Sequence, residues 1–215
     1  MRRWPAEPRA ASTATAPGSP ARRALLASTC IGLAGVAGFA GLVLWPQPAL
    51  ADERVSALLR EGGVAIAFRH AYAPGTFDPP GFQLEQCSTQ RNLNDEGRAQ
   101  ARRLGAWFRS QGLVPAQVRS SPWCRCLDTA SLAFGRVESW AALSSPVGRD
   151  GDERARQVKL LREALGQIPA GRFEAWVTHQ FVLQDLAGVS TSPAEALVVR
   201  AGRDGVEVVA RATLY

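Results

Sequence analysis

Short apolar runs alternate with longer segments of helical spacing along residues 52–215, and this alternation limits the fold more than any other feature. Runs at residues 64–68, 117–119 and 173–178 have the length of buried strands. Strands that alternate with helices build a sheet covered by helices on both faces. The chain is therefore predicted to be an α/β protein, a three-layer sandwich with a mostly parallel central sheet flanked by helices.

Helices are expected between the strands, where start and stop signals bound the amphipathic segments. Ser121 and Pro122 have the residue types of an N-cap followed by the first helical position. Near the C-terminus, residues 202–205 separate two apolar runs in the manner of a hairpin turn. The expected helices are residues 52–61, 94 or 95 to about 111, 121 to about 134, 150 or 152 to about 166 and 181–187, and the expected hairpin strands are residues 196–200 and 206–210.

The segment of residues 1–51 is expected to lie outside this fold. Residues 1–21 are rich in Pro, Ala, Ser and Thr and show no apolar period, which predicts a disordered n-region. Two arginines then precede the uncharged apolar run of residues 24–44, and Ala49-Leu50-Ala51 follows as a small-residue site. A positive start, an apolar middle and an A-x-A end are the parts of a secretory signal peptide.

Two interpretations of this segment remain open. If the signal is cleaved after Ala51, residues 52–215 form a single periplasmic or secreted domain. The apolar run is also long enough to span a bilayer, which takes about 20 residues, so an uncleaved anchor in the inner membrane is the alternative. Both interpretations place the domain outside the cytoplasm, and contact with a membrane is expected only through an uncleaved N-terminal segment.

The net charge of +6 suggests a nucleic-acid partner until the charges are located. Five arginines and one glutamate lie in residues 1–51, so residues 52–215 hold 20 basic and 18 acidic side chains. A domain with a net charge of +2 lacks the strongly basic face that binds polyanions. No nucleic-acid partner is therefore expected.

Three cysteines remain in residues 52–215, namely Cys87, Cys124 and Cys126. They form no pair of C-x-x-C motifs and have no clustered histidines beside them, so no metal site is expected. In an oxidising compartment one disulfide is plausible, with Cys87 bonded to Cys124 or Cys126. On a helix the latter two point about 200° apart, so only one of them can face Cys87.

The chain has only two histidines, and both follow predicted strands directly. His70 ends the sequence Phe68-Arg69-His70, and His179 ends Val177-Thr178-His179. Ligands of α/β proteins bind beyond the carboxyl ends of the strands. One histidine at a strand end would more often be structural, but two in the same position indicate a functional site.

Four motifs along residues 64–200 resemble the histidine phosphatase superfamily, the phosphoglycerate-mutase-like clan, branch 1. The Arg69-His70 pair alone would be a weak signal, but the four motifs in this order and spacing are specific. They are Arg69-His70 itself, the helix opening Asn92-Leu93-Asn94-Asp95-Glu96-Gly97-Arg98-Ala99-Gln100-Ala101, the turn Ser120-Ser121-Pro122-Trp123-Cys124-Arg125 with Thr129-Ala130 after it, and Val177-Thr178-His179.

The resemblance implies a phosphoglycerate-mutase-like fold and a metal-independent phosphomonoester hydrolase without a cofactor. His70 would attack phosphorus and form a phosphohistidine, while Arg69, Arg125 and His179 hold the phosphate. Arginine suits this task because it stays charged and offers phosphate a bidentate fork. Arg125 is expected in the first turn of a helix capped by Ser121, where backbone N–H groups add to anion binding. The substrate would be a small-molecule or phosphoprotein phosphomonoester.

The sequence departs from the family pattern at the proton donor. Family members often have a glutamate near the position of Leu143-Ser144-Ser145, where this chain has serines. A general acid contributes roughly 10²–10⁴-fold to such a reaction, so a catalytically weak or inactive phosphate-binding module is the alternative function. The possible substitutes, each more typical of a solvated or capping carboxylate, are Asp78, Glu138, Asp150, Asp152 and Glu153.

Four further positions have an open role. Ala71 replaces the glycine that many members have after the Arg-His pair, and Glu195 either braces the site or begins a strand. Gln90 and Arg91 follow Cys87 and are placed at the rim of the pocket. A disulfide at Cys87 would then tie that rim to the helix that carries Arg125.

Overall fold

The computed structural model describes residues 48–203 and 205–215. The expected disordered n-region and the apolar core of the signal or anchor fall outside the described residues. The first described helix begins at Pro48, four residues before its predicted start. In the part of the chain that the structure describes, no helix has both the length and the apolar character needed to cross a membrane.

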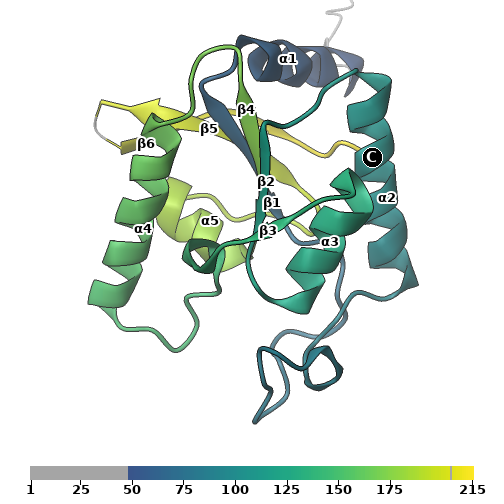
Figure 1. Ribbon diagram of the computed structural model, residues 1–215, viewed down its shortest axis with the longest axis vertical. Coiled ribbons are helices and arrows are strands. Elements are labelled where there is room, and N and C mark those ends of the chain that lie inside the picture. Colours follow the sequence, from purple (N-terminus) through teal and green to yellow (C-terminus); the bar gives the residue numbers. More distant parts are fainter. Residues whose placement is uncertain (1–47, 204) are drawn as a thin grey trace, which may run out of the picture. The chain divides into compact units, whose positions relative to one another are not determined.

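A six-stranded sheet forms the middle layer, with the strand order β3-β2-β4-β1-β5-β6 (Figure 1). Strands β3, β2, β4 and β1 pair in parallel, whereas β5 and β6 form the predicted hairpin and pair antiparallel at one edge. This arrangement confirms the predicted mostly parallel sheet and adds the short strand β3. The bounds are β1 Val64–Arg69, β2 Gln117–Ser120, β3 Glu138–Ser139, β4 Phe173–Thr178, β5 Ala196–Gly202 and β6 Gly205–Ala212.

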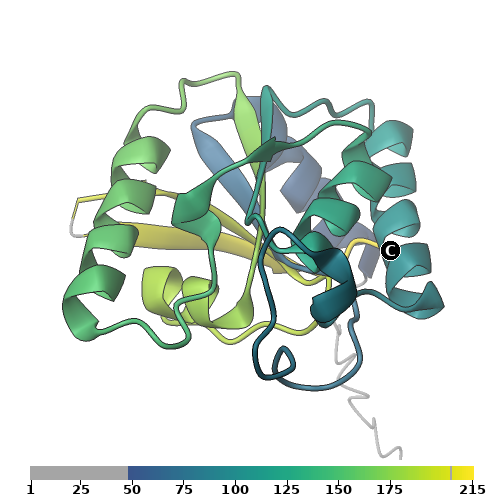
Figure 2. The same cartoon turned by 60° about the horizontal axis from the view of Figure 1, so that its bottom comes forward.

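Helices cover both faces of this sheet, which confirms the three-layer sandwich (Figure 2). One apolar cluster joins the sheet to α1 (Pro48–Glu61), α2 (Asp95–Ser110) and α3 (Cys124–Phe134), with Phe68 and Phe108 among its members. A second cluster joins the opposite face to α4 (Gly151–Gly166) and α5 (Gln180–Ala187) around Trp176. Successive residues of β1 alternate between the two clusters, as the period of a strand requires.

The helix starts follow from local residue chemistry. The Asn94 side chain accepts a hydrogen bond from the Gly97 backbone N–H, and Asp150 and Glu153 form a capping box at α4. Gly97 must be glycine, because a Cβ there would lie 1.9 Å from the Tyr72 carbonyl oxygen. The motif glycine therefore allows α2 to approach the chain just beyond β1.

The predicted start of α3 is wrong by two residues, because the sequence predicts Ser121 as the N-cap and Pro122 as the first helical residue. The helix begins at Cys124, and Trp123 occupies the N-cap position in an extended conformation without a side-chain cap. Ser121 has another partner, the imidazole of His179, 2.8 Å away. The hydroxyl that the sequence assigns to capping the helix is used in the site instead.

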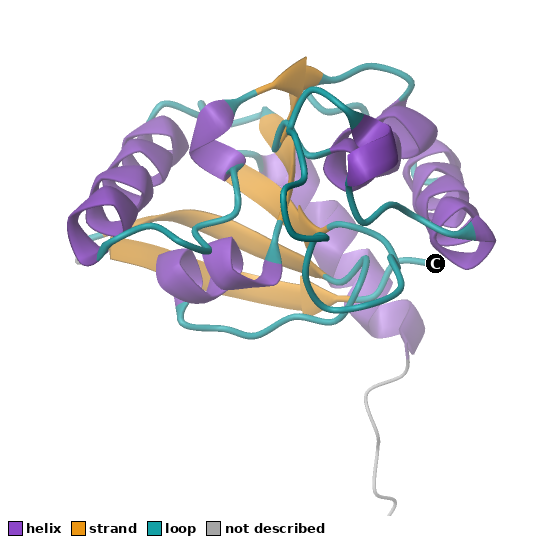
Figure 3. Cartoon of the chain, turned by 90° about the horizontal axis from the view of Figure 1, so that it is seen from below, coloured by secondary structure: helices purple, strands orange, loops and turns teal. Residues whose placement is uncertain are grey.

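A long connection between β1 and α2 crosses the carboxyl ends of the parallel strands, as the view of Figure 3 shows from below. Its only regular element is the 3₁₀ turn η1 (Cys87–Thr89). The structure pairs Cys87 with Cys124, with 5.6 Å between their Cα atoms, and leaves Cys126 as a buried free thiol. The disulfide therefore joins this connection to the first residue of α3.

Candidate active site

The two histidines meet at the carboxyl ends of neighbouring parallel strands. Arg69 at the end of β1 is in register with Thr178 at the end of β4, and the His70 backbone N–H donates to the Thr178 carbonyl over 2.9 Å. The ring centroids of His70 and His179 are 5.6 Å apart, and both residues are buried. The backbone pairing of the sheet thus brings together two side chains that are 109 positions apart in sequence.

The surroundings of His70 fix its tautomer. Its Nδ1 lies 2.8 Å from the Ala71 carbonyl oxygen, which can only accept, so Nδ1 carries the proton. Nε2 is then unprotonated, and its lone pair accepts a hydrogen bond from Arg91 Nη2 over 3.4 Å. Burial, with the positive charges of Arg125 and its neighbouring arginines, lowers the pKa of His70 to about 3, against the opposing hydrogen bond to Ala71. At neutral pH this imidazole is therefore an uncharged nucleophile.

Ser121 and Arg125 hold the ring of His179. The Ser121 hydroxyl lies 2.8 Å from its Nε2, and Arg125 Nη2 lies 3.4 Å from its Nδ1. Burial and then the nearby charged groups, His70 and Arg125 first among them, hold the pKa of His179 well below its usual value. Sequence reasoning missed Ser121 in this role, because a serine before a proline is also the usual sign of a helix start.

Three guanidinium groups, from Arg69, Arg91 and Arg125, surround the histidines. Arg69 Nη1 donates to the Thr191 carbonyl over 2.8 Å, and Arg91 Nη1 donates to the Ala73 carbonyl over 2.6 Å. Each of the three has a buried Nε–H for which the described residues supply no acceptor. Burial and the charge of Arg125 lower the pKa of both Arg69 and Arg91. These groups form a concentrated positive field with unused donors.

The carboxylate of Asp78 is the acceptor at the centre of this field. Arg125 donates to it through Nη1 at 2.8 Å and Nη2 at 3.2 Å, and Trp123 Nε1 donates over 3.1 Å. The Arg91 backbone N–H adds a fourth hydrogen bond of 2.9 Å. Burial alone would raise the pKa of Asp78, but the hydrogen bonds from Arg125 and Arg91 outweigh it and lower the pKa.

The expectation of a solvated or capping carboxylate is therefore wrong for Asp78. It holds for the other four candidate acids. Asp150 and Glu153 form the capping box of α4, Asp152 lies in the first turn of that helix, and Glu138 is exposed on β3. None of these four lines the cavity that contains the histidines.

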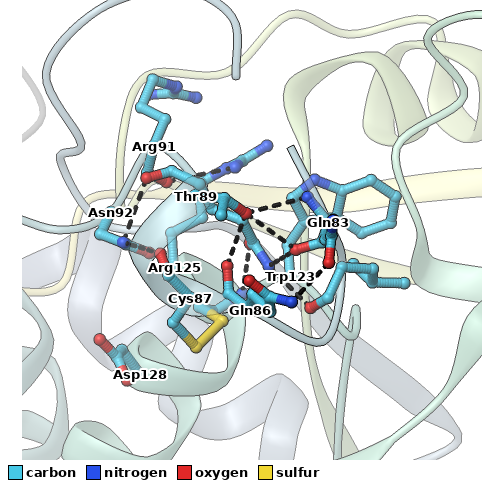
Figure 4. The surroundings of a disulfide bond; sticks show 12 residues. Gln83, Gln86, Cys87, Thr89, Arg91, Asn92, Trp123, Arg125 and Asp128 are labelled. Atoms are coloured by element: carbon cyan, nitrogen blue, oxygen red, sulfur yellow. Dashed lines mark hydrogen bonds between the residues drawn. A yellow bond between two sulfur atoms is a disulfide. The ribbon is translucent and has the colours of Figure 1, made fainter. Parts of the chain in front are cut away.

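The disulfide fixes the side of the site that carries Arg91 (Figure 4). Next to it, the Gln90 side chain accepts from the Cys124 backbone N–H over 3.0 Å and donates to the Leu84 carbonyl over 2.8 Å. Gln90 is buried behind the cavity wall, so its predicted place at the rim is wrong, whereas Arg91 does line the cavity.

Ala71 and Glu195, whose roles the sequence left open, both have structural roles. The buried Ala71 donates its backbone N–H to the Thr129 hydroxyl over 3.0 Å, and that hydroxyl donates to the Arg125 carbonyl over 2.7 Å. Glu195 lies just before β5, where its carbonyl accepts from the Arg69 N–H and its carboxylate pairs with Arg211. Both residues thus hold the ends of elements that carry the site.

A cavity of about 300 Å³ unites these residues. Its charged lining consists of three arginines and Asp78, a net charge of +2 beside two uncharged imidazoles. All four predicted site residues, Arg69, His70, Arg125 and His179, line it. Within the described residues, no group of three or more His, Cys, Asp or Glu side chains is placed to hold a metal ion.

Comparisons with known proteins agree with this geometry. A family model described as the histidine phosphatase superfamily (branch 1) matches residues 83–145, which include Arg91 and Arg125. No curated protein matches the sequence.

Among solved structures, a phosphoserine phosphatase mutant from Entamoeba histolytica in complex with phosphoserine is similar, with 14% identity and a TM-score of 0.52 over 69% of this chain and 95% of that one. A protein described as mycobacterial hydrolase 1 has 16% identity and a TM-score of 0.52 over 70% and 100% of the two chains. These likenesses show the fold, a mixed α/β sandwich of the phosphoglycerate-mutase-like type. The chain is thus similar to the histidine phosphatase superfamily (branch 1) in the matched residues 83–145 and in its fold.

Proposed function

We propose that the protein is a metal-independent phosphomonoester hydrolase that acts through a phosphohistidine on His70. One observation carries the proposal. An uncharged imidazole with an unprotonated Nε2 lies in a cavity whose other groups supply a net charge of +2. A phosphate monoester carries close to two negative charges at neutral pH, so charge and nucleophile match one ligand class.

Binding of the phosphate would use the three guanidinium groups. Arg125 offers a bidentate fork, and Arg69 and Arg91 add charge and further N–H donors. Arg125 lies in the first turn of α3, where the helix N-terminus also favours an anion. Asp78 occupies the fork of Arg125, so the phosphate must share or displace this carboxylate.

The reaction then proceeds in two displacements at phosphorus. His70 Nε2 forms a bond to phosphorus as the bond to the leaving oxygen breaks, and the electron pair departs with that oxygen. Water next attacks phosphorus and passes one proton to a phosphate oxygen, while the N–P bond breaks and its electron pair returns to Nε2. The Nδ1–H of His70 stays hydrogen-bonded to Ala71 throughout and so holds the ring in one orientation.

The guanidinium groups supply the charge neutralisation that phosphoryl transfer demands. His179 stays uncharged, and with the Ser121 hydroxyl donating to its Nε2, its Nδ1–H would donate a hydrogen bond to a phosphate oxygen. The residues at hand therefore suffice for transfer without a metal ion.

A catalytically weak or inactive phosphate-binding module is the second candidate. It is favoured by the absence of a free acid among the cavity residues, because the one carboxylate there is held ionised by four hydrogen bonds. Such a module would bind phosphate in the same field but turn over slowly.

The setting proposed for the enzyme is the periplasm or the exterior of the cell, either free or anchored to the inner membrane by the N-terminal segment. The Cys87–Cys124 disulfide supports this setting, because disulfides persist in oxidising compartments. No nucleic-acid partner is proposed.

The test is hydrolysis of p-nitrophenyl phosphate by the full chain with a chelator present, beside His70→Asn. Asparagine can still donate to the Ala71 carbonyl, so loss of turnover would report the lost nucleophile. Turnover that survives the chelator, with an acid-labile phosphoenzyme absent from the variant, is the expected result. Equal turnover by His70→Asn would refute the phosphohistidine route. A folded wild-type chain that binds phosphate without turnover would establish the binding module instead.

A further inference from the structure

The outer wall of the cavity is aromatic. Phe77 and Phe82 come from the loop after β1, Trp123 precedes α3, and Phe181 lies in the first turn of α5. Phe77 and Phe181 are 66% and 41% exposed, although large apolar side chains gain free energy by burial. We call these four residues the aromatic rim.

The aromatic rim reaches the phosphate-binding groups directly. The ring of Trp123 lies edge-to-face with His179 at a centroid distance of 5.3 Å, and its Nε1 donates to Asp78. The ring of Phe82 packs against that of Trp123 at a centroid distance of 6.0 Å. Apart from Asp78 and the three arginines, no charged residue lines the cavity among those the structure describes. A group attached to the bound phosphate would therefore meet rings rather than charges.

Among the described residues that line the cavity, none is a protonated carboxylic acid that could donate to a leaving group. Ser145 lines it near the position where family members often have a glutamate, and a serine hydroxyl is a poor acid. The Asp78 carboxylate accepts four hydrogen bonds and has its pKa lowered, so it holds no proton to donate near neutral pH. A leaving group must therefore depart as an anion.

We propose that this site takes aryl phosphate monoesters, with the ring of the substrate seated against Phe77, Trp123 and Phe181. This inference rests on the proposed function and names its substrate class. A phenol has a pKa of about 10, like tyrosine, whereas an alkanol is about as weak an acid as water, with a pKa near 16. An aryl ester therefore suits both the aromatic rim and the lack of an acid, because its ring packs against the apolar wall and its leaving oxygen is a stable anion.

With an aryl ester, the first displacement needs no proton from the protein. The P–O bond of the aryl ester breaks, the electron pair leaves on the phenolate oxygen, and the N–P bond to His70 forms. The phenolate takes its proton from water after it leaves the cavity. An alkyl ester would require an alkoxide to leave by the same route, which is far less favourable.

Four phosphate compounds distinguish the effect of an aromatic ring from the effect of the leaving group. Phenyl phosphate has both features, benzyl phosphate has a ring but an alkanol leaving group, acetyl phosphate has a good leaving group but no ring, and ethyl phosphate has neither. We expect kcat/KM for phenyl phosphate to exceed that for benzyl phosphate by about 10²–10⁴, the usual contribution of the missing acid. Equal values for the two would overturn the leaving-group argument.

Binding of phosphonates tests the aromatic rim without turnover, since a P–C bond is not hydrolysed. We expect phenylphosphonate to bind about tenfold more tightly than methylphosphonate, in line with an aromatic contact. Phe77→Ala and Phe181→Ala should abolish this preference. The control Leu160→Ala removes an exposed side chain of α4 outside the cavity and should keep the preference. A preference absent in wild type, or unchanged in both rim variants, would overturn the inference.

The same measurements distinguish a failure of the proposed function from a failure of this inference. Phenyl phosphate turnover that persists in His70→Asn would remove the phosphohistidine route, while the phosphonate preference still decides the aromatic rim. A phosphotyrosine peptide, compared with phenyl phosphate and a phosphoserine peptide, distinguishes the source of the aryl group. A larger kcat/KM for the phosphotyrosine peptide indicates a protein substrate, and a larger value for phenyl phosphate indicates a small aryl ester. A phosphoserine peptide whose kcat/KM equals those of the phosphotyrosine peptide and of phenyl phosphate would overturn the assignment to aryl esters.

Discussion

Two regions of the molecule build the site in different ways. The strand-end region consists of Arg69, His70 and His179, which follow from the parallel pairing of β1 with β4. The loop region, residues 71–94, supplies Asp78 and Arg91 and is held by side-chain hydrogen bonds and one disulfide. The first region rests on the sheet and both apolar clusters, whereas the second rests on contacts that one substitution can remove.

This difference separates the chemistry from the choice of substrate. The nucleophile must keep its position within a fraction of an ångström, and a buried strand end provides that rigidity. The loop region sets which groups reach the phosphate and what surrounds the leaving group, as loops on a rigid scaffold commonly do. Variants in the two regions should therefore fail in different ways.

The largest effect that we expect concerns the strand-end region at acidic pH. Folding lowers the pKa of His70 to about 3 from an unfolded value of about 6.5, so the unfolded chain binds the proton first between these values. The contribution of His70 to the free energy of unfolding is then fully present above pH 6.5 and is lost as the pH falls toward 3. It amounts to roughly 5 kcal/mol over the whole window, at about 1.4 kcal/mol per pH unit.

Urea unfolding at several pH values between 4 and 7 measures this dependence. His70→Asn cannot titrate, so its free energy of unfolding should fall less steeply on acidification than that of the wild type. His179, whose pKa is also lowered, titrates in both proteins, so the difference between the two slopes reports His70 together with its coupling to His179. Parallel pH profiles would show that the folded state does not disfavour the charged imidazole.

The next largest effect concerns the loop region. Cys87 and Cys124 are 37 positions apart, and the chain-entropy model gives a loop of that length about 4 kcal/mol of stabilisation. Cys87→Ser combined with Cys124→Ser should lower the free energy of unfolding by that order. It should raise KM more than it lowers kcat, because the sheet still holds His70. Reduced wild type should behave like the double variant, and an unchanged unfolding transition under reductant would contradict the assigned role.

The contrast between the regions also explains what could be predicted from sequence. The apolar runs predict the strands, and a residue at the end of a buried parallel strand lies at the carboxyl edge of the sheet. Arg69, His70 and His179 could therefore be placed together. Arg125 required the motif around it. The strand β3 was not predicted, because its two exposed residues are too few to show the alternation of apolar and polar residues that indicates a strand.

The contacts of the loop region could not be predicted from the sequence, for a physical reason. Asp78 lies in a segment without period, and its role depends on four hydrogen bonds, three of which come from Trp123 and Arg125, 45 and 47 positions away. The pairing of Cys87 stayed open because both alternatives, Cys124 and Cys126, lie on the same helix. Only the observed start of α3 decides it, since Cys124 is the first residue of that helix and Cys126 points into the core.

A third prediction concerns Arg125, where the two regions meet. Arg125→Lys keeps the charge but loses the fork that contacts Asp78 and His179. We expect kcat/KM for p-nitrophenyl phosphate to fall by about 10²–10³, as for the loss of one oxyanion donor. The control is Arg98→Lys, which alters a half-exposed ion pair with Asp128 and should change kcat/KM little. A loss below tenfold in Arg125→Lys would show that charge alone is sufficient.

The smallest effect, and the most informative about the loop region, is expected for Asp78→Asn. Asparagine can still accept from the Arg91 N–H, but the net charge of the cavity rises from +2 to +3 and Arg125 loses its competing anion. Inorganic phosphate should therefore inhibit about tenfold more strongly. This is less than the roughly 4 kcal/mol that two unit charges 4 Å apart exchange at an effective dielectric constant near 20, because water and salt screen charges in a cavity open to solvent. Asp128→Asn removes an exposed carboxylate from the same helix as Arg125 and serves as the control. Weaker inhibition by phosphate in Asp78→Asn would mean that Asp78 orients Arg125 for the substrate and does not compete with the phosphate for Arg125. The loop region would then be part of the phosphate-binding machinery, as the strand ends are.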